Sequence, residues 1–269
     1  MFSSLPSAFD GFRIAQISDL HNADFGGKIE QKVEKLKPDI IVITGDSIHK
    51  EGEYKNALSV TAHLSEIAPT YYVSGNHESI LSCFFKFRDE MTEKGVVVLD
   101  NETTVLERSG ESVILIGMSD PAFFRSSENS GEKHTTLYPD GRKDRFKQKL
   151  KEISEEITTQ YSKKLSEEAT TQYSKTFRIL LSHRPELYDF YISCDIDITL
   201  SGHAHGGQVR VPLIGALYAP NQGLFPRYTD GMKKSDGKYM IISRGLGKSS
   251  PMPRIFNPPE IVLVSLCRP

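Results

Sequence analysis

The N-terminal part of the chain alternates short apolar segments with segments of helical periodicity. Residues 12–17, 39–43 and 71–73 have the apolar character of strands, and residues 28–37 and 53–68 carry apolar residues on one helical face. Strands that alternate with helices form parallel sheets, because a parallel pair needs a crossover connection. The continuous apolar run at 39–43 is typical of a strand that is buried on both faces. The pattern therefore predicts an α/β fold.

Polar residues that can bind metals follow each of these three strands. Asp19 and His21 follow the first strand, and on extended backbone they would point the same way. Asp46 follows the second strand, and Asn76 and His77 follow the third. The carboxyl ends of parallel strands share one edge of a sheet, where open α/β proteins bind their ligands. Any one of these residues alone would more often be a cap or a loop residue, but three placements in succession predict a site.

The chain changes character after residue 95. Short strands are predicted at 96–99, 103–107 and 112–118, separated by turn residues. This hairpin-rich pattern suggests a second sheet or an antiparallel edge. Further strands are predicted at 177–181, 194–200, 238–242 and 260–266.

Two of the later strands also end in histidines, and imidazole is the commonest metal ligand. His183 follows the strand at 177–181, while His203 and His205 follow the strand at 194–200. The strand ends together offer two carboxylates, one amide oxygen and five imidazoles: Asp19, His21, Asp46, Asn76, His77, His183, His203 and His205. This mixed set suits manganese, iron, zinc or cobalt better than calcium, and it excludes a thiolate zinc site. It is too large for one ion but fits two ions that share a carboxylate.

The composition excludes several classes of protein. Lys and Arg number 33 against 35 Asp and Glu, and the net charge of -2 argues against a generic polyanion binder. Three scattered cysteines predict reduced thiols instead of disulfides. No apolar run approaches the roughly 18 residues of a membrane span, and no secretory signal is visible. We expect a cytoplasmic protein, or a membrane-associated or exported one if a native N-terminal segment is missing from this sequence.

Residues 141–175 contain a tandem repeat, in which SEEITTQYSK at 154–163 returns as SEEATTQYSK at 166–175. Apolar or aromatic residues recur every four positions, a spacing that drifts by about 40° per step around an α-helix. The apolar stripe should therefore wind around the helix. We expect a single domain over 1–269 with a helical insertion at about 141–175; a partner-binding arm is the alternative.

The strand-end motifs resemble, in order, the five blocks of the calcineurin-like metallophosphoesterase superfamily. They are Asp19-x-His21, Gly45-Asp46, Gly75-Asn76-His77-Glu78, Ser182-His183 and Gly202-His203-Ala204-His205. The residues at 206–208, 244–247 and 258–260 resemble a bacterial branch that includes exported phosphodiesterases and UDP-2,3-diacylglucosamine pyrophosphatases. That branch usually carries an N-terminal membrane or export segment. It more often has Thr where Ala204 stands, a difference that could alter a hydrogen bond behind a ligand.

The resemblance implies a central β-sandwich of two sheets flanked by helices, with metals at the carboxyl ends of the strands. It implies one ion held by Asp19, His21, Asp46 and His205, and a second held by Asp46, Asn76, His183 and His203. The expected metal is Mn²⁺, with Fe, Zn and Co as alternatives. Two ions roughly 3.5–4 Å apart generate a metal-bound hydroxide that attacks a phosphodiester or pyrophosphate bond. The implied activity is that of a metal-dependent phosphoric ester hydrolase.

The same resemblance gives His77 the role of protonating the leaving alkoxide, beside the bridging Asp46. Glu78 either orients His77 or caps the helix that follows. Arg244 and Asn22 are candidates for substrate binding, and a structural role is the alternative for each. A different class of function is a non-catalytic protein-binding scaffold on the same fold, although such scaffolds typically lose ligands.

The expected substrate is a small-molecule or lipid-linked phosphodiester or pyrophosphate, with no specific nucleic acid. A lipid-linked substrate would require an apolar platform near the site, together with peripheral membrane association. Loop residues that could supply this platform, or belong to the core instead, are Phe123, Phe124, Leu224, Phe225 and Met252. On a helix predicted at 80–94, Phe84, Phe85 and Phe87 are assigned to the core.

Overall fold

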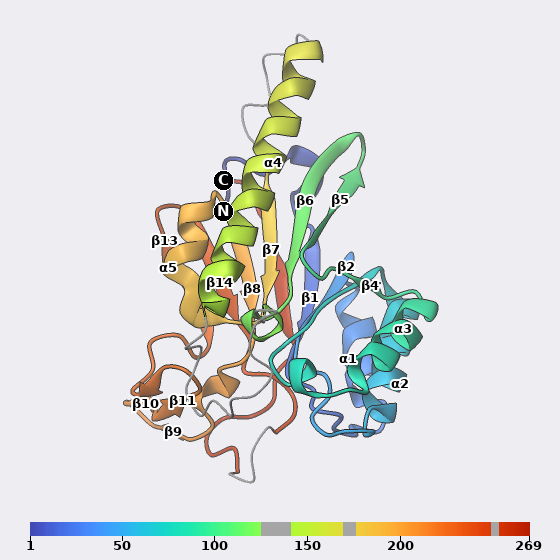
Figure 1. The fold of residues 1–269 in the computed structure, drawn as a ribbon, viewed down its shortest axis with the longest axis vertical. Coiled ribbons are helices and arrows are strands. Elements are labelled where there is room, and N and C mark those ends of the chain that lie inside the picture. The colour runs from blue at the N-terminus through green and yellow to red at the C-terminus, as the bar shows by residue number, and fades with distance from the viewer. Residues whose placement is uncertain (125–140, 169–175, 249–252) are drawn as a thin grey trace.

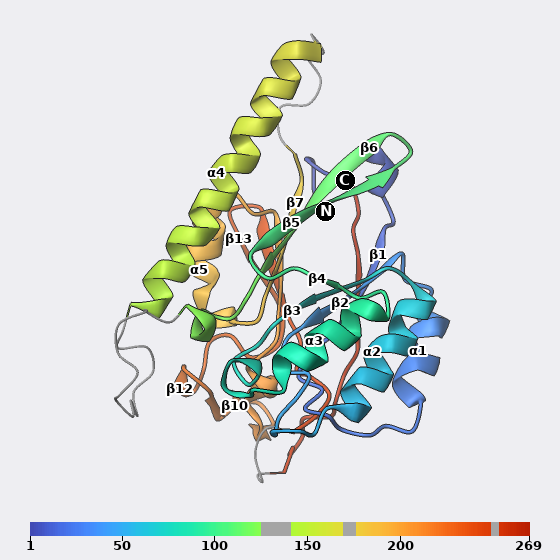
Figure 2. The ribbon, with the colours of Figure 1, turned by 45° about the vertical axis from the view of Figure 1, so that its right-hand side comes forward.

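A computed structural model describes residues 1–124, 141–168, 176–248 and 253–269. Two large β-sheets pack face to face, and helices cover the outer face of each (Figures 1 and 2). The predicted architecture, an α/β fold built on a two-sheet sandwich flanked by helices, is confirmed.

The first sheet contains the predicted β-α-β steps. Its strand order is β15-β1-β2-β3-β4, and β1 to β4 run parallel while β15 pairs antiparallel with β1. The strands are β1 (Arg13–Ile17), β2 (Ile40–Thr44), β3 (Thr70–Val73), β4 (Val97–Val98) and β15 (Val262–Ser265). The helices that cover this sheet are α1 (Lys28–Leu36), α2 (Lys55–Ile67) and α3 (Phe84–Glu93).

The second sheet has a parallel centre and antiparallel edges. In the order β13-β14-β8-β7-β6-β5, the four central strands are parallel, and β13 and β5 form hairpins at the two edges. The strands are β5 (Glu102–Arg108), β6 (Glu111–Met118), β7 (Arg178–Ser182), β8 (Ile198–Ser201), β13 (Gly231–Ser235) and β14 (Lys238–Ile242). The helices on its outer face are α4 (Arg142–Glu168) and α5 (Tyr188–Tyr191).

Smaller elements surround these layers. Two short hairpins pair β9 with β10 and β11 with β12. Their bounds are β9 (Arg210–Val211), β10 (Gly215–Ala216), β11 (Tyr218–Ala219) and β12 (Gly223–Leu224). The 3-10 turns span Ser7–Phe9, Glu78–Ile80, Pro121–Phe123, Pro185–Leu187, Ile192–Cys194 and His205–Gly207.

Successive side chains along a strand point to opposite faces of its sheet. One face packs in the core between the two sheets, and the other packs under the helices that cover the outside. In β2, Ile40 and Val42 belong to the core between the sheets, while Ile41 and Ile43 pack toward α1, α2 and α3. The same two-residue period in β7 places Ile179 between the sheets and Leu180 under the outer helices. Continuous apolar strands are needed because both faces are buried.

The aromatic residues of α3 follow helical geometry. Phe84 and Phe87 are buried as predicted, but the assignment of Phe85 to the core is wrong, since its side chain is 57% exposed. Residues 84, 87 and 91 share one helical face, and Phe85 lies on the opposite side.

The first turns of α4 pack on the second sheet through the buried Phe146, Leu150, Ile153 and Ile157. The last turns extend beyond the sheets (Figures 1 and 2). The first copy of the repeat lies within α4, whereas most of the second lies outside the described residues. The single domain with an insertion at 141–175 stays a prediction.

Among the helices in the described ranges, none has both the length and the apolar character needed to cross a membrane.

We predict that Leu150→Ala lowers the free energy of unfolding by about 2–5 kcal/mol, because it leaves a cavity between α4 and the second sheet. Lys151→Ala on the exposed side of the same helix should change it by less than about 0.5 kcal/mol. Urea denaturation measures both values. Equal stability of the two variants would show that α4 does not contribute to this core.

Candidate metal centre

The loops that follow β1, β2, β3, β7 and β8 meet at one end of the two sheets, as the sequence predicted. Their backbone is left-handed at five of the predicted ligands, with φ of 52° at Asp19, 49° at His21, 54° at Asp46, 65° at His203 and 47° at His205. Non-glycine residues rarely adopt this region, and such strain clusters at functional sites. The expected extended backbone at Asp19 and His21 is therefore wrong, although both side chains do reach the same group of donors.

Glycine lets these loops approach closely. A Cβ added to Gly45, whose φ is +85°, would lie 2.7 Å from Nδ1 of His183 and 2.7 Å from the backbone of Gly75. Any side chain at this position would push apart the loops after β2, β3 and β7.

The carboxylate of Asp46 lies at the centre of the site. Its Oδ2 atom is 3.2 Å from Nε2 of His183, 3.8 Å from Nε2 of His77 and 3.9 Å from Nε2 of His21. Its Oδ1 atom accepts a 2.9 Å hydrogen bond from the backbone N–H of His77. One oxygen thus faces imidazoles from three different loops.

A first group of donors consists of Asp19, His21, Asp46 and His205, whose ligand atoms all lie within 4.8 Å of one another. Nε2 of His205 is 3.2 Å from Nε2 of His21 and 3.3 Å from Oδ1 of Asp19. The hydroxyl of Ser18 donates to Oδ2 of Asp19 at 2.7 Å, which fixes this carboxylate. All four ligand residues are buried.

A second group consists of Asp46, His183 and His203, again within 4.8 Å. Nδ1 of His183 lies 2.7 Å from the carbonyl oxygen of Thr44, so we assign the ring N–H to this nitrogen. Nε2 of His183 then faces Asp46 and, among the described residues, makes no hydrogen bond. The buried Oδ1 atom of Asn76 also lacks a partner in the part of the chain that the structure describes. A hydrogen-bonded Nδ1 with a free Nε2 is the usual preparation of a histidine for a metal.

Burial lowers the pKa of three imidazoles, those of His21, His203 and His205, which keeps them in the neutral form that binds metals. Burial alone would raise the pKa of Asp46, but the rings of His183 and His77 hold it well below its usual range. Burial would likewise lower the pKa of His183, but the Asp46 carboxylate raises it to about 10, so without a metal Nε2 carries a proton toward Asp46 that a bound metal would replace. The ionised Asp46 therefore attracts positive charge to this point.

A buried ion pair supports the second group and was missed by the sequence analysis. The guanidinium of Arg184 binds both carboxylate oxygens of Asp120, and its Nη1 lies 2.7 Å from Nε2 of His203. Nδ2 of Asn221 reaches the same histidine nitrogen at 3.2 Å. The strand-end rule could have found two of these residues, because Asp120 follows β6 and Arg184 adjoins His183.

Glu78 holds the loops that carry the ligands. One oxygen accepts from the N–H of Ser47 at 2.6 Å and from the Tyr72 hydroxyl at 2.9 Å. The other accepts from the N–H of Gly75 at 2.9 Å and of Asp46 at 3.1 Å. Burial and the nearby Asp46 raise the pKa of Glu78 to about 8, while this set of donors favours the ionised carboxylate. These contacts fit neither predicted role of Glu78, orienting His77 or capping a helix.

The two candidate substrate residues make structural contacts. The side-chain oxygen of Asn22 accepts from the N–H of Ala57 at 3.0 Å, which ties the loop after β1 to α2. Nη2 of Arg244 pairs with Oε2 of Glu260 at 2.6 Å. Contact of Asn22 or Arg244 with a substrate stays a prediction.

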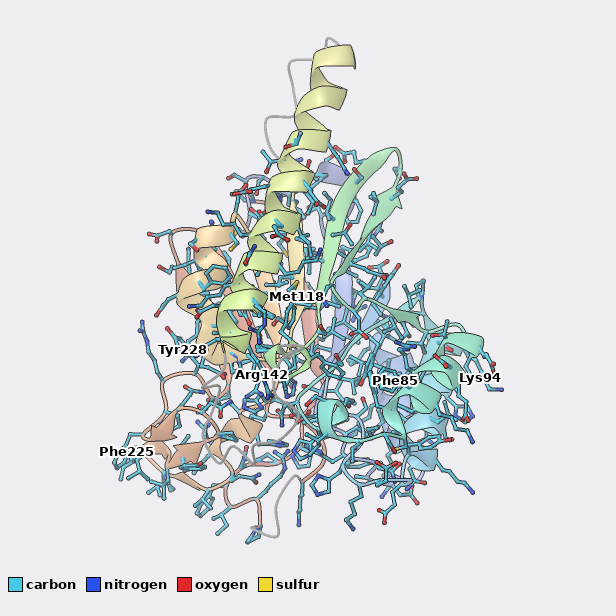
Figure 3. All side chains as sticks on the ribbon, in the orientation of Figure 1. Phe85, Lys94, Met118, Arg142, Phe225 and Tyr228 are labelled. Carbon is cyan, nitrogen blue, oxygen red and sulfur yellow. The ribbon has the colours of Figure 1, made fainter. Side chains whose placement is uncertain are left out.

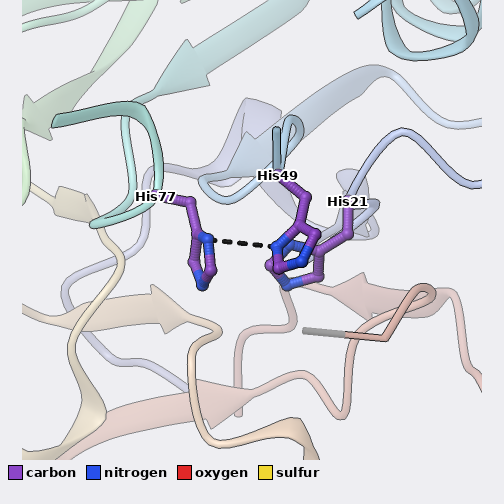
Figure 4. A group of neighbouring side chains, drawn as sticks. All are labelled: His21, His49 and His77. Carbon is purple, nitrogen blue, oxygen red and sulfur yellow. Dashed lines mark hydrogen bonds between the residues drawn. The ribbon is translucent and has the colours of Figure 1, made fainter. Parts of the chain in front are cut away.

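His49 is a further histidine beside the site that the sequence analysis did not single out. It follows β2 by five residues, and its Nδ1 lies 3.2 Å from Nδ1 of His77 (Figure 4).

Comparisons with known proteins agree with these motifs. Residues 12–207 match the sequence profile of a family described as calcineurin-like phosphoesterase. The chain is 26% identical to the uncharacterized metallophosphoesterase YkuE of Bacillus subtilis, over 98% of this chain and 82% of that protein. It is 24% identical to the phosphodiesterase YaeI of Escherichia coli, over 95% and 82% of the two chains. A dimetal phosphatase from Danio rerio shares the fold, with a TM-score of 0.51, 14% identity and 88% coverage of each chain.

We predict that Glu78→Ala lowers the free energy of unfolding by about 3 kcal/mol or more, because each buried N–H left without an acceptor costs roughly 1–3 kcal/mol. Urea denaturation measures the change. Glu66→Ala, at an exposed position on α2, is the matched control and should be nearly neutral. Wild-type stability of Glu78→Ala would contradict the role that we assign to this carboxylate.

Proposed function

The chain belongs to the calcineurin-like phosphoesterase family, and on this premise we propose that it is a dinuclear metal-dependent phosphoesterase. The proposed reaction is hydrolysis of a phosphodiester or pyrophosphate bond. The observation that carries the proposal is the position of Asp46, whose carboxylate belongs to two groups of buried donors at once. A carboxylate in that position is suited to bridging two ions.

We assign one ion to the first group, Asp19, His21, Asp46 and His205. The second ion is assigned to Asp46, Asn76, His183 and His203. The residues fit this use, since Oδ1 of Asn76 and Nε2 of His183 are buried polar atoms without hydrogen-bond partners among the described residues. The mixture of nitrogen and oxygen donors favours Mn²⁺, with Fe, Zn and Co as alternatives.

When bound, such a pair of ions supplies Lewis acidity toward the phosphoryl oxygens and a nucleophile at neutral pH. The fold excludes water from these ligand side chains, because those of Asp46, His21 and His183 are at most 1% exposed. The side chain of His77 is 20% exposed, so it lies where the buried site opens to solvent. We assign to its Nε2 atom, 3.8 Å from Asp46, the proton that the leaving oxygen takes up.

Two observations support the substrate class. The relative YaeI is named a phosphodiesterase, which favours a diester. Leu224 and Phe225 are 73% and 68% exposed, and Phe225 lies at the periphery of the molecule (Figure 3). They follow Asn221, whose side chain contacts the proposed metal ligand His203, so two exposed apolar residues adjoin a loop that reaches the site. This supports a small-molecule or lipid-linked substrate and peripheral membrane association as parts of the proposal.

The other candidate platform residues contribute less. Phe123 and Phe124 are half-buried and pack against Phe84 and Phe146. Met252 lies outside the described residues.

We predict that the purified chain with Mn²⁺ hydrolyses an aryl phosphodiester, and that Asn76→Ala and His203→Ala lower kcat/KM by at least about 100-fold. Two metal ions contribute several kcal/mol to such a transition state, and about 1.4 kcal/mol corresponds to a factor of ten. The release of the aryl alcohol measures the rate, and mass spectrometry of the dialysed protein measures bound metal.

The control for these variants is His63→Ala, which changes an exposed residue of α2. It should keep wild-type activity and metal content. Full activity of Asn76→Ala and His203→Ala would refute the dinuclear assignment.

We predict that His77→Ala lowers kcat for an alkyl phosphodiester by about 10²–10⁴-fold, the usual contribution of a general acid. With a nitrophenyl leaving group, which departs without a proton, the loss should be below about tenfold. Steady-state kinetics on matched alkyl and nitrophenyl esters give both values. An equal loss on the two esters would exclude His77 as the proton donor.

A further inference from the structure

Three neighbouring histidines, one buried and two half-buried, form a second kind of cluster, which we call the outer histidine cluster: His21, His49 and His77 (Figure 4). One ring nitrogen of each lies within 4.8 Å of the other two. The residues come from the loops after β1, β2 and β3, so the fold of the first sheet brings them together.

The distance between the rings of His49 and His77 is the one expected for two imidazoles that share a cation. Their Nδ1 atoms are 3.2 Å apart. Two imidazoles on one tetrahedral zinc ion, with Zn–N of about 2.0–2.1 Å, place their nitrogens about 3.3–3.4 Å apart. A single shared proton or a single metal ion can therefore join these two atoms with little movement of either ring.

His21 provides an independent observation. Its side chain is fully buried, and its Nδ1 atom makes no hydrogen bond within the described part of the chain. Its ring stands nearly perpendicular to those of both neighbours, with centroids 5.3 Å from His49 and 4.8 Å from His77. A buried polar atom without a hydrogen bond destabilises the folded state unless a ligand or an ion binds to it.

The chemistry of the cluster differs from that of the dinuclear centre. Its three donors are imidazole nitrogens without a carboxylate, a set that favours zinc, copper or nickel over manganese and magnesium. His21 also offers Nε2 to the first ion, so its Nδ1 binds a further cation only as an imidazolate, and its N–H proton passes to solvent when that cation binds. The absence of carboxylate donors, the loss of a proton from His21 and the charge of two neighbouring ions make the site weaker than the dinuclear centre. His49 and His77 are only half-buried, so an ion can exchange with solvent.

We propose that the outer histidine cluster binds a third divalent cation of the zinc, copper or nickel class, and that this cation inhibits the enzyme. A cation on His77 occupies the side chain to which we assign proton donation. The inhibition rests on the proposed function, whereas the binding of the cation does not.

The binding is tested by counting metals. The chain is loaded with Mn²⁺ and then dialysed against excess Zn²⁺, and total manganese plus zinc per chain is measured by mass spectrometry. We expect three ions per wild-type chain and two in His49→Ala. His49→Gln replaces the imidazole with an amide that can hydrogen-bond but is a poor ligand for these cations, so two ions are again expected.

His63→Ala removes a histidine on the exposed face of α2 and should retain three ions. Because exchange of manganese for zinc in the dinuclear centre leaves the total unchanged, it cannot mimic this result. An equal total in wild type, His49→Ala and His49→Gln would overturn the proposed site.

The inhibition is tested by titrating Zn²⁺ into the Mn²⁺-loaded enzyme during hydrolysis of an alkyl phosphodiester. We expect at least tenfold inhibition of wild type and His63→Ala, and at least a tenfold higher zinc concentration for half-inhibition of His49→Ala. Identical inhibition curves would refute inhibition through this cluster. If the three-to-two difference in metal count holds while wild type hydrolyses no phosphoester, the cation site stands and the proposed function falls.

Discussion

The site depends on one carboxylate, that of Asp46, which is buried among imidazoles from three loops. A bare carboxylate at this depth would be unstable, since removing it from water is expensive. The surrounding rings lower its pKa, and the N–H of His77 binds its other oxygen. His183 belongs to the second sheet, whereas His21 and His77 belong to the first. The carboxylate therefore acquires its surroundings only when the two sheets pack together.

The backbone that presents Asp46 is held as firmly as the side chain. Glu78 accepts hydrogen bonds from the loop after β2 and from Gly75 after β3, so one buried carboxyl group ties two ligand loops together. The carbonyl of Thr44 at the end of β2 orients His183 across the sheet interface. Five ligands adopt left-handed backbone, and this strain persists because the two sheets and their cores determine where each loop must start.

Much of this arrangement can be predicted from the sequence. The strand ends are readable because buried parallel strands are continuous apolar runs, and their carboxyl ends share an edge. The contacts that depend on loop geometry are not readable in this way. The pairing of Arg184 with Asp120 joins residues 64 positions apart, and the contact of His49 with His77 joins two different loops. The prediction that Phe85 lies in the core was wrong for a similar reason. The sequence spacing alone does not show which face of α3 meets the sheet, and the structure does.

The spacings Asp-x-His and His-x-His do not by themselves predict which residues share a group of donors. Asp19 and His21 enter the same group of donors, while His203 and His205 enter different groups, although both pairs are two residues apart. Neither pair lies on extended backbone. A short 3-10 turn begins at His205, directly after the loop that carries His203, and it turns the second imidazole toward Asp19. The N–H of His203 donates a hydrogen bond to the Asp19 carboxylate, which ties the residues before this turn to the loop after β1. The division of the two imidazoles therefore follows from a contact between distant segments, which the two-residue spacing alone does not determine.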